Sequence, residues 1–264
     1  MAFQKYLLIP KLMWYGVRAP RNQGVAWNRY WSRIDHTGYD GDVLWDAGST
    51  VEIDQSLAHL RRHMDRTLPI VDIGCGNGRH ARALAGHFPY VVGLDVAERA
   101  IEKARQETHG IENVAYCVLD ATMPRAGMRL AHEFGEMNVY MRGVLHILDR
   151  QQRVTLVQNI RDMLGQRGTA YILETNHGGS PLDYMMYLGA TAASIPAPLR
   201  RCIEAGIRAP DHFGEREYNK YFPTAQWATL DSGTSVLHGV PIRQPDQLQP
   251  IPAFFALTRP RQEQ

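Results

Sequence analysis

The chain has 264 residues and a net charge of +2, which suits one α/β domain with additions and gives no field that would attract nucleic acid or an anionic membrane. The three cysteines are odd in number and unclustered, so a disulfide framework and a C-x-x-C zinc site are not expected, and a cytoplasmic location fits. No apolar stretch is long enough for a transmembrane helix.

Residues 1–50 are rich in aromatic side chains and hold four of the five tryptophans. We expect this segment to be an N-terminal cap packed on the core, a lid over a ligand, or both. Tyr30 lies in its densest run, Trp27–Trp31, and aromatic faces attract a desolvated cation. Exposed aromatic residues also form subunit contacts, so a homodimer that forms through this segment is an alternative that the sequence leaves open. A helix is then predicted from Val51 to Leu68, ended by Pro69.

The next stretch joins a strand to a helix through three glycines. Residues 70–73 are apolar apart from Asp72, and glycines follow at positions 74, 76 and 78. A dinucleotide site needs G-x-G-x-x-G, but Arg79 stands where the third glycine of that pattern belongs. The carboxylate of Asp72 would repel a pyrophosphate and attract an ammonium group. The pattern therefore favours S-adenosylmethionine (SAM) over NAD.

This stretch resembles motif I of the class I SAM-dependent methyltransferases, E/D-x-G-x-G-x-G. The resemblance implies a Rossmann-like α/β fold with a seven-stranded, mostly parallel sheet, helices on both faces and an antiparallel last strand. It implies SAM as cofactor and S-adenosylhomocysteine (SAH) as product. Asp72, Gly74, Cys75 and Gly76 are the cofactor-binding residues expected in the motif.

Two further acids follow at strand ends. Asp95 closes the apolar run 90–96 and lies 21 residues past Gly74, the spacing expected for a carboxylate that binds the ribose hydroxyls, with Val96 beside it. A helix is predicted over 97–109 and a strand over 114–122. In the family an acid at the end of this strand accepts from the adenine amino group, which assigns that role to Asp120 and a backbone contact to Ala121. A turn-forming role for Asp120 is the alternative.

Residues 136–146 are the predicted fourth strand and its exit loop, which resembles the family segment facing the methyl group. Met141 is therefore expected near the cofactor. His146, in that loop, is the first candidate for a general base, because imidazole titrates near neutral pH. Its alternative role is packing or a backbone hydrogen bond. His177 and Glu174, at the end of the predicted strand 168–176, are further candidates, and Tyr140 is a candidate for orienting the acceptor.

Residues 178–222 break the strand–helix alternation, and we expect them to form helices inserted over the strand ends, where a substrate would sit. Residues 236–242 and 252–258 are the last two predicted strands. The predicted organisation is a cap or lid over 1–50 and a SAM-binding core over 51–264 that contains this insert.

The predicted function is methyl transfer from SAM to a small-molecule acceptor, a metabolite or natural product, at O, N, C or S by in-line displacement. The D/N/S-P-P-Y/F/W loop of nucleobase methyltransferases is absent, because Val139 follows Asn138. Three alternatives stay open: a protein or RNA methyltransferase, a protein of this fold that binds SAM or SAH without methylating (a cyclase, for example), and an NAD(P)-dependent oxidoreductase.

Overall fold

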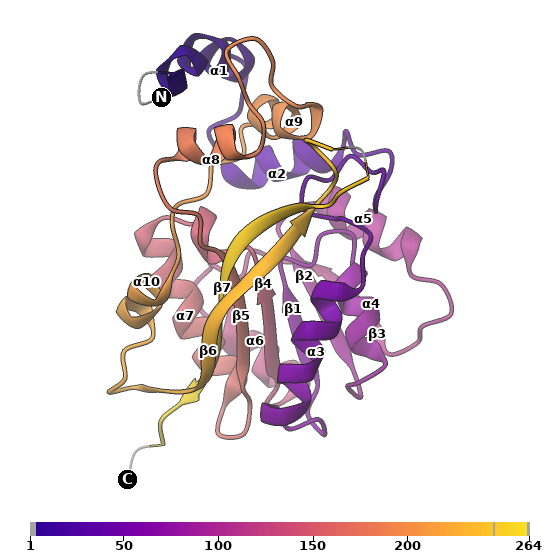
Figure 1. Ribbon diagram of the computed structural model, residues 1–264. Coiled ribbons are helices and arrows are strands. Elements are labelled where there is room, and N and C mark those ends of the chain that lie inside the picture. The colour runs from indigo at the N-terminus through magenta and orange to yellow at the C-terminus, as the bar shows by residue number, and fades with distance from the viewer. Residues whose placement is uncertain (1–3, 245, 263–264) are drawn as a thin grey trace.

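A computed structural model describes residues 4–244 and 246–262, which form a seven-stranded sheet in the order β3-β2-β1-β4-β5-β7-β6 (Figure 1). The strands are β1 (Ile70–Ile73), β2 (Val91–Asp95), β3 (Val114–Val118), β4 (Asn138–Arg142), β5 (Ala170–Thr175), β6 (Trp227–Gly239) and β7 (Gln249–Pro260). Neighbouring strands from β3 to β5 pair in parallel, and β7 pairs antiparallel with both β5 and β6. The predicted fold class is confirmed.

Strands β1, β2, β4 and β5 are short, mostly apolar and buried, as expected for parallel strands covered by helices on both faces, whereas β3, at the sheet edge, is only partly buried. The last two strands are longer than predicted, with 13 residues in β6 and 12 in β7. Residues 228–235 of β6 are mostly polar and only partly buried, because β6 is the edge strand of the sheet. Their polarity concealed the first half of this strand in the sequence.

Helices cover both faces of the sheet and divide the core in two (Figure 1). On one face lie α3 (Val51–His63), α4 (Arg79–Ala85) and α5 (Glu98–Glu107), packed against side chains that include Tyr140 and Tyr171. On the other lie α6 (Ala126–Phe134), α7 (Arg150–Leu164) and α10 (Glu215–Tyr221), packed against side chains that include Val139 and Met141. Successive strand residues thus alternate between the two cores.

Two helices differ from the prediction. The helix predicted over Val51–Leu68 ends at His63, because Asp65 accepts hydrogen bonds from the Thr67 N–H at 3.0 Å and the Thr67 hydroxyl at 2.6 Å and holds the chain in a turn. The helix α6 was not predicted. It starts directly after Arg125, whose φ of 66° lies in the left-handed region. A non-glycine residue seldom adopts that conformation, so no local pattern indicates a helix start at this position.

The N-terminal and inserted helices lie together beyond the carboxyl ends of the parallel strands (Figure 1). They are η1 (Gln4–Leu8), α1 (Ile9–Gly16) and α2 (Gln23–Trp31), with α8 (Pro181–Tyr187) and α9 (Ala197–Ala205) from the segment after β5. Both α1 and α2 contact α9. A short helix, η2 (Leu145–Ile147), follows β4. Among the described residues, no helix has the length and apolar character needed to cross a bilayer.

Candidate functional site

A cavity lies at the carboxyl ends of β1, β2, β4 and β5, roofed by the N-terminal and inserted helices. In an open α/β sheet this edge is where ligands bind. The wall on the sheet side consists of residues from the strand ends and the loops after them: Gly74, Gly76, Asp95, Val96, Asp120, Ala121, Arg142, Gly143, Val144, His146 and Thr175. Six residues of the predicted cofactor site therefore border one cavity.

The glycine turn after β1 leaves no room for side chains. Gly74 and Gly76 have φ values of 76° and 54°, a conformation that L side chains rarely adopt. A Cβ atom at Gly74 would lie 2.7 Å from the Val144 side chain, and one at Gly76 would lie 2.9 Å from the Trp31 ring. These glycines let the backbone form the cavity wall itself, between the loop after β4 and α2.

Two buried carboxyl groups lie beside this turn. Asp95 accepts the Gly76 N–H at 3.0 Å and the Ala97 N–H at 2.9 Å, and burial raises its pKa to about 6. In Asp72 the buried Oδ2 atom has no hydrogen-bond partner among the described residues. Burial, together with the nearby Asp95, raises the pKa of Asp72 to about 7. A buried carboxyl oxygen without a donor fits a site that a cationic ligand group completes.

A second, smaller cavity adjoins the turn and contains Asp72 and Cys75 in its wall, together with Arg142 and Trp45. Arg142 borders both cavities and was not predicted as a site residue. Its guanidinium forms an ion pair with Glu52 on α3 and donates to the Trp45 carbonyl at 3.0 Å. Although burial opposes ionisation, Arg142 holds the pKa of Glu52 below its usual value. The sequence could have suggested Arg142, as a cation that ends an apolar strand.

The third strand ends at Val118, earlier than predicted, so Asp120 lies in the turn that follows β3, where it borders the larger cavity. Its Oδ1 atom accepts the Thr122 N–H at 2.8 Å and the Thr122 hydroxyl at 2.6 Å. Asp120 thus forms the turn that was the alternative to adenine binding, and it forms that turn at the cavity wall. The two roles are compatible, because a carboxylate has two acceptor oxygens.

His146 and Glu174, predicted separately as candidate bases, form one pair. Glu174 is fully buried and accepts the backbone N–H groups of Val144, Leu145 and His146 at 2.9–3.2 Å. Its Oε2 atom also lies 2.6 Å from His146 Nδ1. His146 borders the larger cavity, whereas Glu174 is not among its lining residues. The structure therefore places the imidazole at the cavity and the carboxylate behind it.

Besides Asp72, Cys75 and Glu174, four more predicted residues lie outside the larger cavity wall. Tyr140 is fully buried among α3 and α4, and its hydroxyl lies 2.7 Å from His80 Nδ1. Met141 is fully buried in the opposite core. His177 packs against the rings of Tyr184 and Tyr187. The fourth residue, Tyr30, lies behind the cavity, stacked at 5.3 Å on Trp45.

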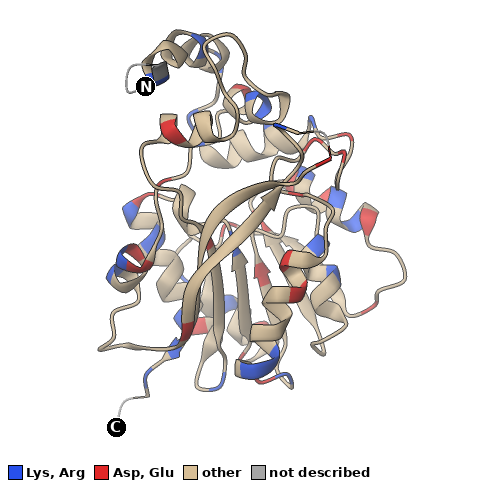
Figure 2. Ribbon diagram, viewed as in Figure 1, with Lys and Arg blue, Asp and Glu red and all other residues tan. Residues whose placement is uncertain are grey.

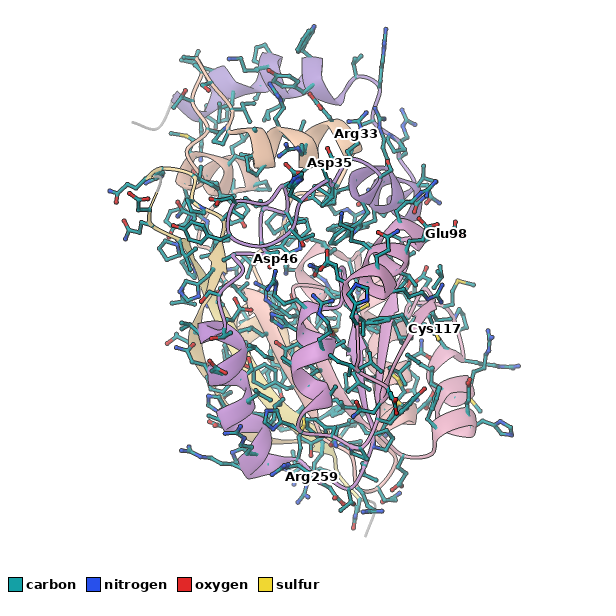
Figure 3. All side chains as sticks on the ribbon, turned by 90° about the vertical axis from the view of Figure 1, so that its right-hand side faces the viewer. Arg33, Asp35, Asp46, Glu98, Cys117 and Arg259 are labelled. Atoms are coloured by element: carbon teal, nitrogen blue, oxygen red, sulfur yellow. The ribbon has the colours of Figure 1, made fainter. Side chains whose placement is uncertain are left out.

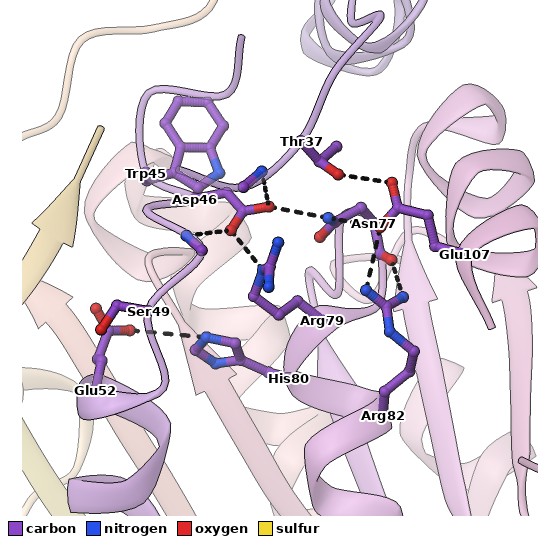
Figure 4. A network of polar contacts seen from close by, with 12 residues as sticks. Thr37, Trp45, Asp46, Ser49, Glu52, Asn77, Arg79, His80, Arg82 and Glu107 are labelled. Carbon is purple, nitrogen blue, oxygen red and sulfur yellow. Dashed lines mark hydrogen bonds and ion pairs between the residues drawn. The ribbon is translucent and has the colours of Figure 1, made fainter. Parts of the chain in front are cut away.

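A polar network holds residues 32–50 against the glycine turn (Figure 4). We call these residues, which connect α2 to α3 and include Trp45, the aromatic segment. Asp46 forms an ion pair with Arg79 at 2.6 Å and accepts from the Asn77 side chain at 2.9 Å. Asn77 also donates to Glu107 at 3.1 Å, and Thr37 donates to the other oxygen of Glu107 at 2.8 Å. Figure 3 shows the same segment from the side, descending to Asp46 beside the core. The sequence did not predict this network, because its members are distant in the chain.

The roof of the cavity is mostly apolar. It includes two tryptophans from α2, Trp27 and Trp31, and four residues on or just after α9: Leu199, Cys202, Ile203 and Ile207. Leu237 of β6 and Ile251 of β7 extend the same apolar surface. Among the described residues that line this half of the cavity, Arg208 is the one cation, and it is exposed. The cavity thus joins a polar half at the glycine turn to an apolar half beneath α9.

Comparisons with known proteins agree with this geometry. A family model described as a methyltransferase domain matches residues 70–168. The crystal structure of a SAM-dependent methyltransferase from Anabaena variabilis is 31% identical, with 92% of this chain and 97% of that chain covered and a TM-score of 0.80. The structure of a DhpI–SAH complex is 16% identical, with 92% and 100% covered and a TM-score of 0.54, and shares the fold.

A third similar structure belongs to a protein that is described in connection with the conversion of a disulfide bond into a thioacetal group during echinomycin biosynthesis. It is 22% identical, covers 82% of this chain and 84% of its own, and has a TM-score of 0.57, so it too shows the fold alone. No curated protein sequence matches the chain.

Proposed function

The chain belongs to the family of SAM-dependent methyltransferases, and from this premise we propose that it methylates a small, largely apolar acceptor molecule. SAM is the cofactor. The observation that carries the proposal is the single cavity that runs from the glycine turn, past His146, to the apolar roof beneath α9. A polar cofactor half and an apolar acceptor half then meet where the candidate base stands.

The residues of the polar half suit SAM. Asp72, with its unpartnered buried oxygen, is the group we assign to the cationic amino-acid end, and Arg142 lies close enough to border the same small cavity and take the carboxylate end. Asp95, at the end of β2, is assigned to the ribose hydroxyls, and Asp120 with Ala121 to the adenine. Each assignment matches one charged or donor group of the cofactor with a group of opposite character.

SAM, when bound, supplies a methyl group on a positively charged sulfur, which an acceptor displaces in line. The protein mainly has to hold the two reactants in this orientation, which is worth roughly 7–11 kcal/mol. The glycine turn fixes one side of the cavity and the Asp46 network fixes the aromatic segment over it. Trp31 and Trp45 border both cavities and place apolar rings beside the glycine turn.

His146 is assigned as the general base for an acceptor that carries a proton, such as a phenol or an alcohol. Glu174 accepts the backbone N–H groups of Val144, Leu145 and His146, so it acts as the acceptor at each of these contacts. We assign it the acceptor role in the 2.6 Å contact as well, with the hydrogen on Nδ1 of His146. In the neutral ring this leaves Nε2 as the unprotonated nitrogen, ready to accept a proton from the acceptor.

The apolar half supports a small-molecule acceptor rather than a protein or RNA. The roof is formed by helices from distant parts of the chain, α2 and α9, with Leu199 and Ile203 in the wall. Pockets of this kind, apolar with a few convergent polar groups, are typical small-molecule sites. The acceptor that fits has an apolar body and one ionisable group that reaches His146.

The test is a screen with SAM carrying an isotope-labelled methyl group. Phenols, aliphatic acids, amines and thiols would be offered in parallel with a protein mixture and with RNA, and products would be identified by mass spectrometry. The proposal expects label in small apolar compounds alone. Label in protein or RNA alone would contradict it, and a rearranged product of unchanged mass would support the cyclase alternative instead.

A further inference from the structure

The outermost helix of the molecule carries large apolar side chains on its solvent side. Met13, Trp14 and Val17 of this region are 70%, 72% and 76% exposed, and Tyr6 and Leu7 in η1 are more than half exposed. We call these five residues the outer ridge. Monomeric proteins rarely expose so many large apolar residues in one short stretch, and such patches mark contact sites.

The opposite side of this helix faces the protein. Leu12 and Tyr15 pack against the core below, as does the buried Leu8 at the end of η1, and Lys11 donates to the Ala192 carbonyl. The protein itself thus covers the inner side of α1, whereas the outer ridge faces solvent. We therefore expect a binding partner to cover the outer ridge.

The charge of this part of the chain indicates what covers it. Residues 1–34 contain six Lys or Arg and no Asp or Glu, so this segment has a net charge of +6. Because the whole chain has a net charge of +2, the remaining residues carry −4 (2 − 6). Figure 2 shows the basic residues of the N-terminal helices. Lys5 turns inward to Asp183 and Lys11 to the Ala192 carbonyl, whereas Arg18 and Arg21, just after α1, are exposed. The whole-chain charge conceals this asymmetry.

We propose that η1 and α1 bind the surface of a membrane containing anionic lipids, in addition to the methyl transfer proposed above and independently of it. The outer ridge enters the interface, where Trp and Tyr side chains are favoured, and Arg18 and Arg21 lie against the anionic headgroups. A second copy of the chain fits this surface less well, because a symmetric contact would bring the two acid-free segments together.

The experiment measures binding of the full chain to phosphatidylcholine vesicles with and without phosphatidylglycerol, by sedimentation. We expect binding to the anionic vesicles that weakens with salt, and a blue shift of tryptophan emission from Trp14, whose ring is exposed in solution. The double variant Met13→Gln/Trp14→Gln should bind about tenfold more weakly or worse. Arg18→Gln/Arg21→Gln should lose about tenfold or more, and only on anionic vesicles.

Met128→Gln is the matched control, because Met128 is 58% exposed on α6, away from the outer ridge, and should bind like the unaltered protein. Thermal unfolding of each variant checks that the fold is kept. Failure of the unaltered protein to bind anionic vesicles would overturn the proposal. So would equal binding by Met13→Gln/Trp14→Gln, or light scattering that shows a dimer which this variant converts to a monomer.

Discussion

His146 Nδ1 lies 2.6 Å from Glu174 Oε2, and the same carboxylate accepts the backbone N–H of His146. The pair couples the loop after β4 to the end of β5, so the position of the imidazole at the cavity depends on a side chain that does not line it. A buried carboxylate behind a histidine fixes the ring orientation and the tautomer. We therefore propose that Glu174 is a positioning residue for His146 and that the two act as a unit.

Glu174→Gln separates this role from simple structural support. We expect turnover to fall by roughly 10²–10⁴-fold, because the amide no longer stabilises the imidazolium formed when His146 takes a proton. The rate–pH profile should move as well, since the charge beside the ring is lost. A profile unchanged in shape, with a rate loss that follows only the loss of thermal stability, would restrict Glu174 to a structural role.

Asp72→Asn tests the carboxyl group whose Oδ2 atom has no hydrogen-bond partner among the described residues. The pKa of Asp72 is raised to about 7 by burial and by Asp95, so the folded protein holds a proton that the unfolded chain releases near pH 4. The free energy of unfolding of the SAM-free protein therefore contains a contribution that is present below pH 4 and is lost as the pH rises to about 7. The Asp72→Asn protein should not show this loss. At pH 8 its free energy of unfolding should exceed that of the unaltered protein by a few kcal/mol.

The same substitution should have the opposite effect on cofactor binding. Ionised Asp72 attracts the ammonium of SAM, so affinity for SAM and SAH should rise from pH 6 to pH 7.5 in the unaltered protein and rise less in Asp72→Asn, where Asp95 alone still titrates near pH 6. Calorimetric titration at several pH values gives both curves. Parallel curves for the two proteins would remove Asp72 from the cofactor site.

Asp95→Asn should weaken SAM binding by roughly 1–3 kcal/mol, because the amide is a poorer acceptor for buried ribose hydroxyls. In the unaltered protein Asp95 accepts the backbone N–H groups of Gly76 and Ala97. The amide oxygen of the variant still accepts one of them, so the fold should be kept. Asp54→Asn, at an exposed position on α3, is the matched control. Unaltered SAM affinity in Asp95→Asn would contradict the ribose assignment.

Ile203→Trp tests the acceptor half of the cavity. Ile203 lies on α9 and borders the cavity, so a larger ring there fills space that the acceptor is proposed to occupy. We expect SAH binding within about twofold of the unaltered protein and a KM for the acceptor raised about tenfold or more. Ile203→Val should restore normal kinetics. Lost SAH binding in Ile203→Trp would mean that the two halves are not separate.

The sequence predicted the sheet and the polar half of the site because both are local. One continuous stretch, from Ile70 to Arg79, contains the strand, the turn and the start of the helix, and Asp95 and Asp120 follow at strand ends. Parallel strands place their carboxyl ends at one edge, so residues predicted separately from spacing come together there.

Side-chain direction explains the candidates that do not line the larger cavity. Tyr140 and Met141 are consecutive in β4, so they point into opposite cores, and the cavity begins only with the following residue, Arg142. The pairing of His146 with Glu174, and of Arg142 with Glu52, joins positions far apart in the chain, and no local pattern indicates such pairs.

The most direct test of the proposed mechanism is single-turnover methyl transfer by His146→Gln, with SAH affinity measured on the same protein. His146 borders the cavity without a predicted contact to the ribose or adenine, so SAH should bind with unchanged affinity. Transfer to a phenolic or alcoholic acceptor from the screen should slow by roughly 10²–10⁴-fold. Unchanged transfer, or loss of SAH binding together with transfer, would contradict His146 as the base.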